Sequence, residues 1–163
     1  MAQRRWARDL VASTVLMAFG SSAVHSAGSL SFYSLTPCRI VDTRGPTGTT
    51  GGPALTQGTA RNFPIMTYCG VPTTAKAAML NITMVTPTAD GFIEVWQYGL
   101  PNPHVSNVNA LANEPAIANG AAVPLAGGGL DVTAVYGGVT QGATSHLIID
   151  VMGPAVQSES LFF

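Results

Sequence analysis

Residues 92–98 read Phe-Ile-Glu-Val-Trp-Gln-Tyr, a segment without the spacing of an amphipathic helix. In an extended strand, successive side chains point to opposite faces. Ile93 and Val95 would therefore lie on one face of such a strand. The other face would carry Phe92, Glu94, Trp96 and Tyr98. A period of two between the faces indicates a β-strand.

A second alternating segment comes directly before the first one. In residues 80–86, Leu80, Ile82 and Met84 share one face of an extended strand. Residues 87–91 read Pro-Thr-Ala-Asp-Gly, which are turn-forming residues. Two strands joined by so short a turn predict a β-hairpin.

Short β-rich runs recur along the rest of the chain. With 18 Gly and 11 Pro, nearly every window of a dozen residues is interrupted, which disfavours long helices. The β-rich runs cover residues 30–35, 39–43, 60–66, 77–86, 91–98, 106–111, 116–125, 130–136 and 145–152. Residues 45–58 hold five Gly and two Pro and are expected to form a loop. We therefore expect an all-β fold, a single β-sandwich or jelly-roll-like domain of about nine short strands.

The composition excludes several classes of protein. Charged residues make up 9% of the 163 residues and the net charge is -1, whereas soluble domains typically carry roughly 25% charged residues. Hydrophobic residues reach 47%, which argues against a disordered chain. They are rarely contiguous, which argues against a protein with many membrane spans. Without a basic excess, nucleic-acid binding is not expected.

The first residues have the features of a secretory signal peptide. Arg4, Arg5 and Arg8 precede an apolar stretch at residues 10–19, and small residues follow it. This stretch is shorter than the roughly 20 residues that a permanent transmembrane helix needs. We expect a signal peptide at residues 1–27, a β-sandwich at 28–153 and an apolar C-terminal tail at 154–163. The product would be secreted, extracellular or at the cell surface, with no membrane span after cleavage.

The chain has two cysteines, Cys38 and Cys69, and both follow the expected signal peptide. In an oxidising compartment, two such residues most simply form one disulfide. Two thiols without clustered histidines are too few for a structural zinc site, and no Cys-x-x-Cys pair is present. We therefore predict one disulfide that closes a loop of 32 residues.

A charged cluster follows the first cysteine. Arg39, Asp42 and Arg44 lie within six residues, and Asp150 is an isolated carboxylate inside an apolar run. A carboxylate in such a run is costly unless it is paired or hydrogen-bonded. We predict that Arg39, Arg44 or backbone N–H groups satisfy Asp42 and Asp150 as a structural polar clasp. The alternative is an anion or sugar site built on the two arginines.

Candidate catalytic residues are sparse. After the expected signal peptide, the histidines are His104 and His146, and the sequence holds no G-x-S-x-G elbow. In a strand, His146 and Asp150 would lie about 13 Å apart, too far for a hydrogen-bonded dyad. The carboxylates are scattered singly, and no calcium-loop or H-E-x-x-H motif is present. We expect a protein that is not an enzyme, with no metal and no cofactor.

Two features suggest what the domain contacts. The apolar end segments, with Leu30 and Phe32 at one end and residues 161–163 at the other, could add to a neighbouring copy. The candidate assembly contacts are Leu30, Phe32, Leu161, Phe162 and Phe163. Alternatively, Phe92, Trp96 and Tyr98 could form a stacking platform for a cell-surface glycan. Packing of these rings in the core is the simpler interpretation. Rings inside the sandwich would indicate core packing, whereas exposed coplanar rings would indicate a ligand platform.

Several motifs resemble those of a family of secreted bacterial domains. Residues 37–44 read PCRIVDTR, 69–72 CGVP, 80–83 LNIT, 106–109 SNVN, and 150–153 DVMG. The family typically shows PCRxxDTR, CGVP, LNVT, SxxN and DVxGYF, and the match covers about residues 32–153. The resemblance implies a β-sandwich on exported proteins and transfers no catalytic residue. This chain departs from it after Gly153, where Pro154 and Ala155 replace the family's aromatic residues.

Removal of residues 1–27 would leave eleven of the fifteen charged side chains. So few charges leave a surface with little protection against association. We therefore expect an extracellular, non-catalytic structural protein that forms a homo-oligomer or homopolymer, as a subunit of a fibre or a cell-surface layer. The alternative is a secreted module that binds a carbohydrate or another surface ligand in adhesion.

Overall fold

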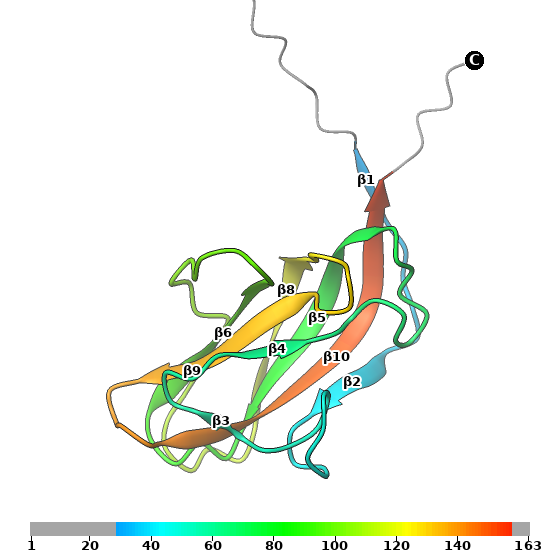
Figure 1. Cartoon of the computed structure of the whole chain (residues 1–163). Helices are drawn as coiled ribbons and strands as arrows, with labels where there is room; N and C mark the ends of the chain where they lie inside the picture. Colours follow the sequence, from blue (N-terminus) through cyan, green and yellow to red (C-terminus); the bar gives the residue numbers. More distant parts are fainter. Residues whose placement is uncertain (1–28, 158–163) are drawn as a thin grey trace, which may run out of the picture.

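The computed structural model describes residues 29–157, which form ten β-strands and no helix. The strands are β1 (Leu30–Phe32), β2 (Cys38–Asp42), β3 (Leu55–Thr56), β4 (Arg61–Phe63), β5 (Ala75–Val85), β6 (Gly91–Gln97), β7 (Val108–Ala110), β8 (Ile117–Pro124), β9 (Val132–Gly138) and β10 (Thr144–Gln157). They are arranged in two antiparallel sheets (Figure 1). The all-β fold predicted from the alternating segments is therefore confirmed.

The first sheet is built around β10, its longest strand. One edge of β10 pairs with β5, and β5 pairs in turn with β8. Along its other edge, β10 pairs successively with β3, β2 and β1. All of these pairings are antiparallel, so β10 connects every strand on that edge to the rest of the sheet.

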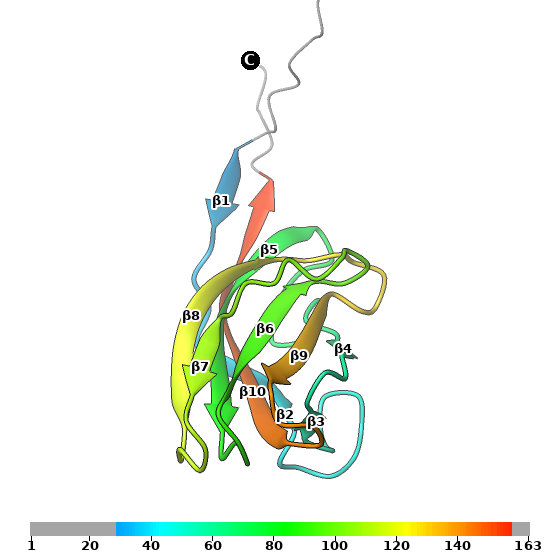
Figure 2. The same ribbon diagram turned by 90° about the vertical axis from the view of Figure 1, so that its left-hand side faces the viewer.

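The second sheet has the order β4-β9-β6-β7 and faces the first (Figure 2). Alternate side chains of the two sheets meet between them, as in other β-sandwiches. Ile82 and Ile149 come from the first sheet, Ile93 and Tyr136 from the second, and none of the four is exposed. The hydroxyl of Tyr136 donates a hydrogen bond to the carbonyl of Ala89 at 2.6 Å, which satisfies its polar end inside the sandwich.

The predicted hairpin of residues 80–98 is wrong. β5 and β6 are consecutive, but β5 pairs with β10 and β8 whereas β6 pairs with β7 and β9. Their connection crosses from one sheet to the other. It is held by backbone bonds to other segments, including Thr88 N–H to Thr144 O at 2.8 Å. Turn-forming residues indicate a change of direction but not whether the chain stays in the same sheet.

Two strand boundaries also differ from the prediction. Leu55 and Thr56, inside the expected loop, form β3 against the start of β10, because Leu55 is completely buried there. β10 continues past Met152 to Gln157. Its register shifts between Val151 and Gly153, and proline is tolerated in strands at such irregularities. The Gly153-Pro154 pair therefore does not end the strand.

The predicted disulfide is present. Cys38 and Cys69 are bonded, with their Cα atoms 5.9 Å apart. The bond joins the first residue of β2 to the segment between β4 and β5. Both cysteines pack against the edge of the hydrophobic core.

Candidate functional site

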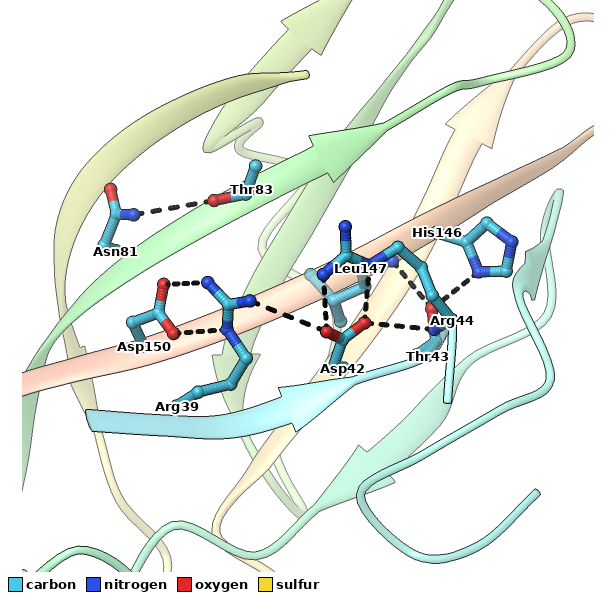
Figure 3. Close-up of polar contacts among 9 residues, drawn as sticks. All are labelled: Arg39, Asp42, Thr43, Arg44, Asn81, Thr83, His146, Leu147 and Asp150. Carbon is cyan, nitrogen blue, oxygen red and sulfur yellow. Dashed lines mark hydrogen bonds and ion pairs between the residues drawn. The ribbon is translucent and has the colours of Figure 1, made fainter. Parts of the chain in front are cut away.

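Arg39 and Asp150 form a cross-strand ion pair on the outer face of the first sheet (Figure 3). The two residues are register partners on β2 and β10. Nε of Arg39 donates to Oδ1 of Asp150 at 2.8 Å, and Nη2 donates to Oδ2 at 3.1 Å. The hydrogen bond to Asp150 raises the pKa of Arg39. Asp150, the isolated carboxylate in the apolar run of residues 147–151, thus accepts two hydrogen bonds from one arginine.

Asp42 and Arg44 form a second pair beside the first. Nε and Nη2 of Arg44 donate to the two carboxylate oxygens at 2.8 and 2.6 Å, and the Arg44 backbone N–H donates to Oδ1 at 3.1 Å. Nη1 of Arg39 lies 3.6 Å from Oδ2 of Asp42 and joins the two pairs. The side-chain bonds from Arg44 are the main reason that the pKa of Asp42 is lowered to about 2.

The lowered pKa of Asp42 predicts a modest loss of stability in acid. The unfolded chain, with an aspartate pKa of about 3.9, takes up the proton first. The pair therefore stabilises the fold above pH 4, and this contribution is lost as the pH falls through 2. The partners' side chains are 28% and 46% exposed, so we expect Asp42→Asn to cost at most about 1 kcal/mol at pH 6. Denaturant unfolding at pH 6, 4, 3 and 2 measures the difference, which should shrink toward pH 2. A cost that is the same at every pH would contradict the ion-pair explanation.

The structure brings together all four residues of the predicted polar clasp. Their two positive and two negative charges neutralise one another, and both guanidinium groups are directed at carboxylates (Figure 3). An anion bound to either arginine would have to compete with these carboxylates. The arrangement therefore favours a structural fastening of β2 to β10 over an anion or sugar site.

Two smaller polar contacts flank the clasp (Figure 3). Oγ1 of Thr43 accepts a hydrogen bond from the Leu147 backbone N–H at 2.8 Å and lies 3.2 Å from Nδ1 of His146. Nδ2 of Asn81 donates to Oγ1 of Thr83 at 3.5 Å on β5. Thr43 is 1% exposed, so its hydroxyl serves the strand pairing rather than a surface reaction.

The three aromatic residues near β6 do not pack in the core, so that simpler interpretation was wrong. Ile93 and Val95 fill the core from the opposite face. The ring of Phe92 lies against Gly137, where an added Cβ would overlap it. Nε1 of Trp96 donates to the carbonyl of Leu100 at 2.9 Å. Tyr98 follows the end of β6 and is 39% exposed. The rings thus have three different surroundings.

An apolar groove of about 260 Å³ lies beside Trp96. One wall comes from the loop of residues 98–107, which contributes Leu100, Pro101 and Pro103, and the other from Val123 and Pro124 at the end of β8.

Two partly buried contacts hold this loop in place. Nδ2 of Asn102 donates to Oε2 of the buried Glu94 at 2.7 Å. Oδ1 of Asn107 accepts from the Val95 backbone N–H at 2.6 Å. Because the middle and the last residue of the loop are fastened to β6, the groove is a formed feature of the fold.

The candidate assembly contacts fall into two groups. Leu30 and Phe32 lie on β1, which pairs with the end of β10 in the same chain. Both side chains remain exposed, at 51% and 54%. Leu161, Phe162 and Phe163 lie outside the described residues.

Asp131 is a buried polar residue that the sequence did not reveal. Its carboxylate accepts backbone N–H bonds from Ile65 and Met66, both at 2.7 Å, and from Gly127 at 3.0 Å. Asp131 is completely buried. Its partners are backbone groups, two of them more than 60 residues away, so no side-chain motif could have identified them. The residue fastens the segment after β4 to the start of β9.

Arg61 is the second residue that the sequence did not single out. Its guanidinium group donates to the carbonyls of Pro53 and Gly51, and more weakly to those of Gly48 and Gly52. It also lies 4.9 Å from the centre of the Phe63 ring. Burial lowers the pKa of Arg61. This side chain organises the glycine-rich loop that precedes β3.

Residues 29–157 contain no group of three or more His, Cys, Asp or Glu side chains that could hold a metal ion. In the same range, no helix is long and apolar enough to cross a membrane. No family model matches the chain, and neither a curated protein nor a solved structure shows significant similarity to it.

Proposed function

We propose that this chain is an exported, non-catalytic structural protein that self-associates through the end of the sandwich carrying β1. The observation that carries the proposal is β1 itself. This strand is at the edge of the first sheet, and Leu30, Phe32 and the adjacent Tyr33 are each more than half exposed. An uncharged, apolar edge strand is a site where another chain can add. Figures 1 and 2 show β1 and the end of β10 reaching beyond the second sheet.

The distribution of charge supports self-association. Residues 29–157 carry ten charged side chains, of which four neutralise one another in the clasp. Glu94 and Asp131 are buried, and Arg61 is engaged with backbone carbonyls. The outer surface therefore holds few free charges that would repel a second copy.

The disulfide supports export, because such bonds persist in oxidising compartments. The Cys38–Cys69 bond is of the kind that persists outside the cytosol. The order of charged, apolar and small residues at positions 1–27 agrees with secretion, as does the resemblance to secreted bacterial domains. A place in a fibre or surface layer would follow if the associated copies make further contacts.

The variant Leu30→Lys tests the proposal. A charge on the exposed edge opposes strand addition, so we expect the oligomers of the unmodified protein to fall to monomers in sedimentation velocity. Val139→Lys is the matched control, because Val139 is 99% exposed and directly follows β9. β9 ends at the opposite end of the sandwich from β1 (Figure 1). If both variants associate like the unmodified protein, β1 is not the contact.

The second candidate function is binding of a carbohydrate or another surface ligand. The groove beside Trp96 favours it, because an aromatic ring there could stack on a sugar. The separate surroundings of Phe92 and Tyr98 argue against one extended platform. A saturable change in tryptophan fluorescence on titration with oligosaccharides, abolished by Leu100→Glu, would favour this function over self-association.

A further inference from the structure

The groove beside Trp96 and the end of β10 lie at the same end of the sandwich. β8 and β10 are both antiparallel to β5, so they run in the same direction. Ala155, Ala77 and Pro124 form one row across these three strands. With neighbouring strands about 4.8 Å apart, Ala155 and Pro124 are about 10 Å apart. The chain therefore leaves the sheet close to one wall of the groove.

The segment that follows β10 has a composition suited to this groove. Residues 158–163 read Ser-Glu-Ser-Leu-Phe-Phe, so a polar half precedes an apolar half. In an extended conformation, six residues span about 20 Å. The groove measures about 260 Å³. An apolar cavity of about 150 Å³ holds a benzene molecule, so the groove has room for a phenylalanine ring.

The strand direction favours a second copy over the same chain. β10 passes the row that contains Pro124 and continues to Gln157, beyond its own groove. Entry into that groove would require the chain to reverse within the short polar half of the segment. In a second copy that packs end to end with the first, the groove lies at the facing end of the sandwich, so the segment runs toward it.

We propose that residues 161–163 of one copy fill the groove beside Trp96 of a second copy, and that the exchange is reciprocal. This inference rests on the proposed self-association and adds a second contact to the one proposed at β1. Because donor segment and acceptor groove lie at the same end, reciprocal exchange closes into a two-fold dimer. A fibre or layer would need a contact elsewhere on the sandwich.

Engineered cysteines test the exchange. Leu100 is exposed at 56% on the groove wall, and Ser160 directly precedes the apolar half of the segment. In the double variant Leu100→Cys, Ser160→Cys, docking brings the two thiols together at an effective concentration in the mM range. On a non-reducing gel we expect a covalent dimer, at least about tenfold more abundant than in the control.

The control variant carries Leu111→Cys with Ser160→Cys. Leu111 is 69% exposed and directly follows β7. The last residue of β7 pairs with the first residue of β6, whereas the groove lies beside the last residues of β6. Leu111 is therefore at the opposite end of β6 from the groove. Equal amounts of dimer in both variants would overturn docking in the groove. A disulfide that joins positions 100 and 160 within one chain, identified by peptide mapping, would overturn the role of the second copy.

Sedimentation of the unmodified protein separates this inference from the proposed function. If the protein associates but the engineered cysteines form no specific bond, the exchange is wrong and self-association stands. If the protein remains monomeric and no covalent dimer forms, both fail. Loss of association in the variant Leu100→Glu, but not in Leu111→Glu, would support the groove as a contact between the two copies.

Discussion

Asp131→Ala is expected to lower the free energy of unfolding by about 3 to 5 kcal/mol. The carboxylate accepts three backbone N–H bonds in a site with no exposure to solvent. Hydrogen bonds to a charged group contribute about 1.5 to 3 kcal/mol each, and their losses do not add fully. Alanine would leave the N–H groups of Ile65, Met66 and Gly127 without this acceptor.

Equilibrium unfolding in urea measures the loss. Asp131→Asn should be intermediate, because an amide oxygen can replace only part of the carboxylate. Asp90→Ala is a suitable control, since Asp90 accepts one exposed backbone bond, from Ala112 at 2.8 Å, and should cost less than about 1 kcal/mol. A loss at Asp131 no larger than that at Asp90 would contradict the structural role assigned to the buried carboxylate.

Removal of the disulfide is the second large effect. The Cys38–Cys69 bond closes a loop with a sequence separation of 31 residues. The chain-entropy model assigns such a loop about 3 to 4 kcal/mol, through restriction of the unfolded chain. The double variant Cys38→Ser, Cys69→Ser should therefore lose an amount close to this from its free energy of unfolding.

Urea unfolding with and without reductant provides the test. Reductant should destabilise the unmodified protein to the level of the double variant and should leave the double variant unchanged. An unmodified protein that keeps its stability after reduction of both thiols would show that the loop 39–68 is held by other contacts. Arg61, which binds the carbonyls of the glycine-rich segment in this loop, is the first of these to examine.

The fold class could be predicted because alternation is a local property. Ile93 and Val95 enter the core, as the period of two in residues 92–98 requires. The sheet in which a strand lies is not local, and β5 and β6 were wrongly paired for that reason. Leu55 was missed because a strand of two residues is too short to show alternation.

The clasp could be predicted for a different reason. Asp150 is a charged residue in an apolar run, and Arg39 and Arg44 were among the few cations that could neutralise it. Asp131 gave no comparable signal, because its partners are backbone N–H groups rather than side chains. The environment of Trp96 also depends on the loop of residues 98–107, which folds back along β6.

The physical properties of the domain are consistent with a structural role. The clasp, the disulfide and Asp131 fasten segments distant in the sequence, so the sandwich is tied at several points. β1 projects beyond the second sheet (Figure 1); Leu30 and Phe32 on this strand and Tyr33 directly after it are exposed apolar residues. A domain tied together in this way, with an apolar edge strand at one end, is suited to the proposed self-association.

Light scattering of the purified, oxidised protein over a hundredfold range of concentration tests self-association without any substitution. The proposed contact at the β1 end predicts a weight-average mass that rises from one chain to two or more as the concentration increases. A mass of one chain at every concentration would contradict it.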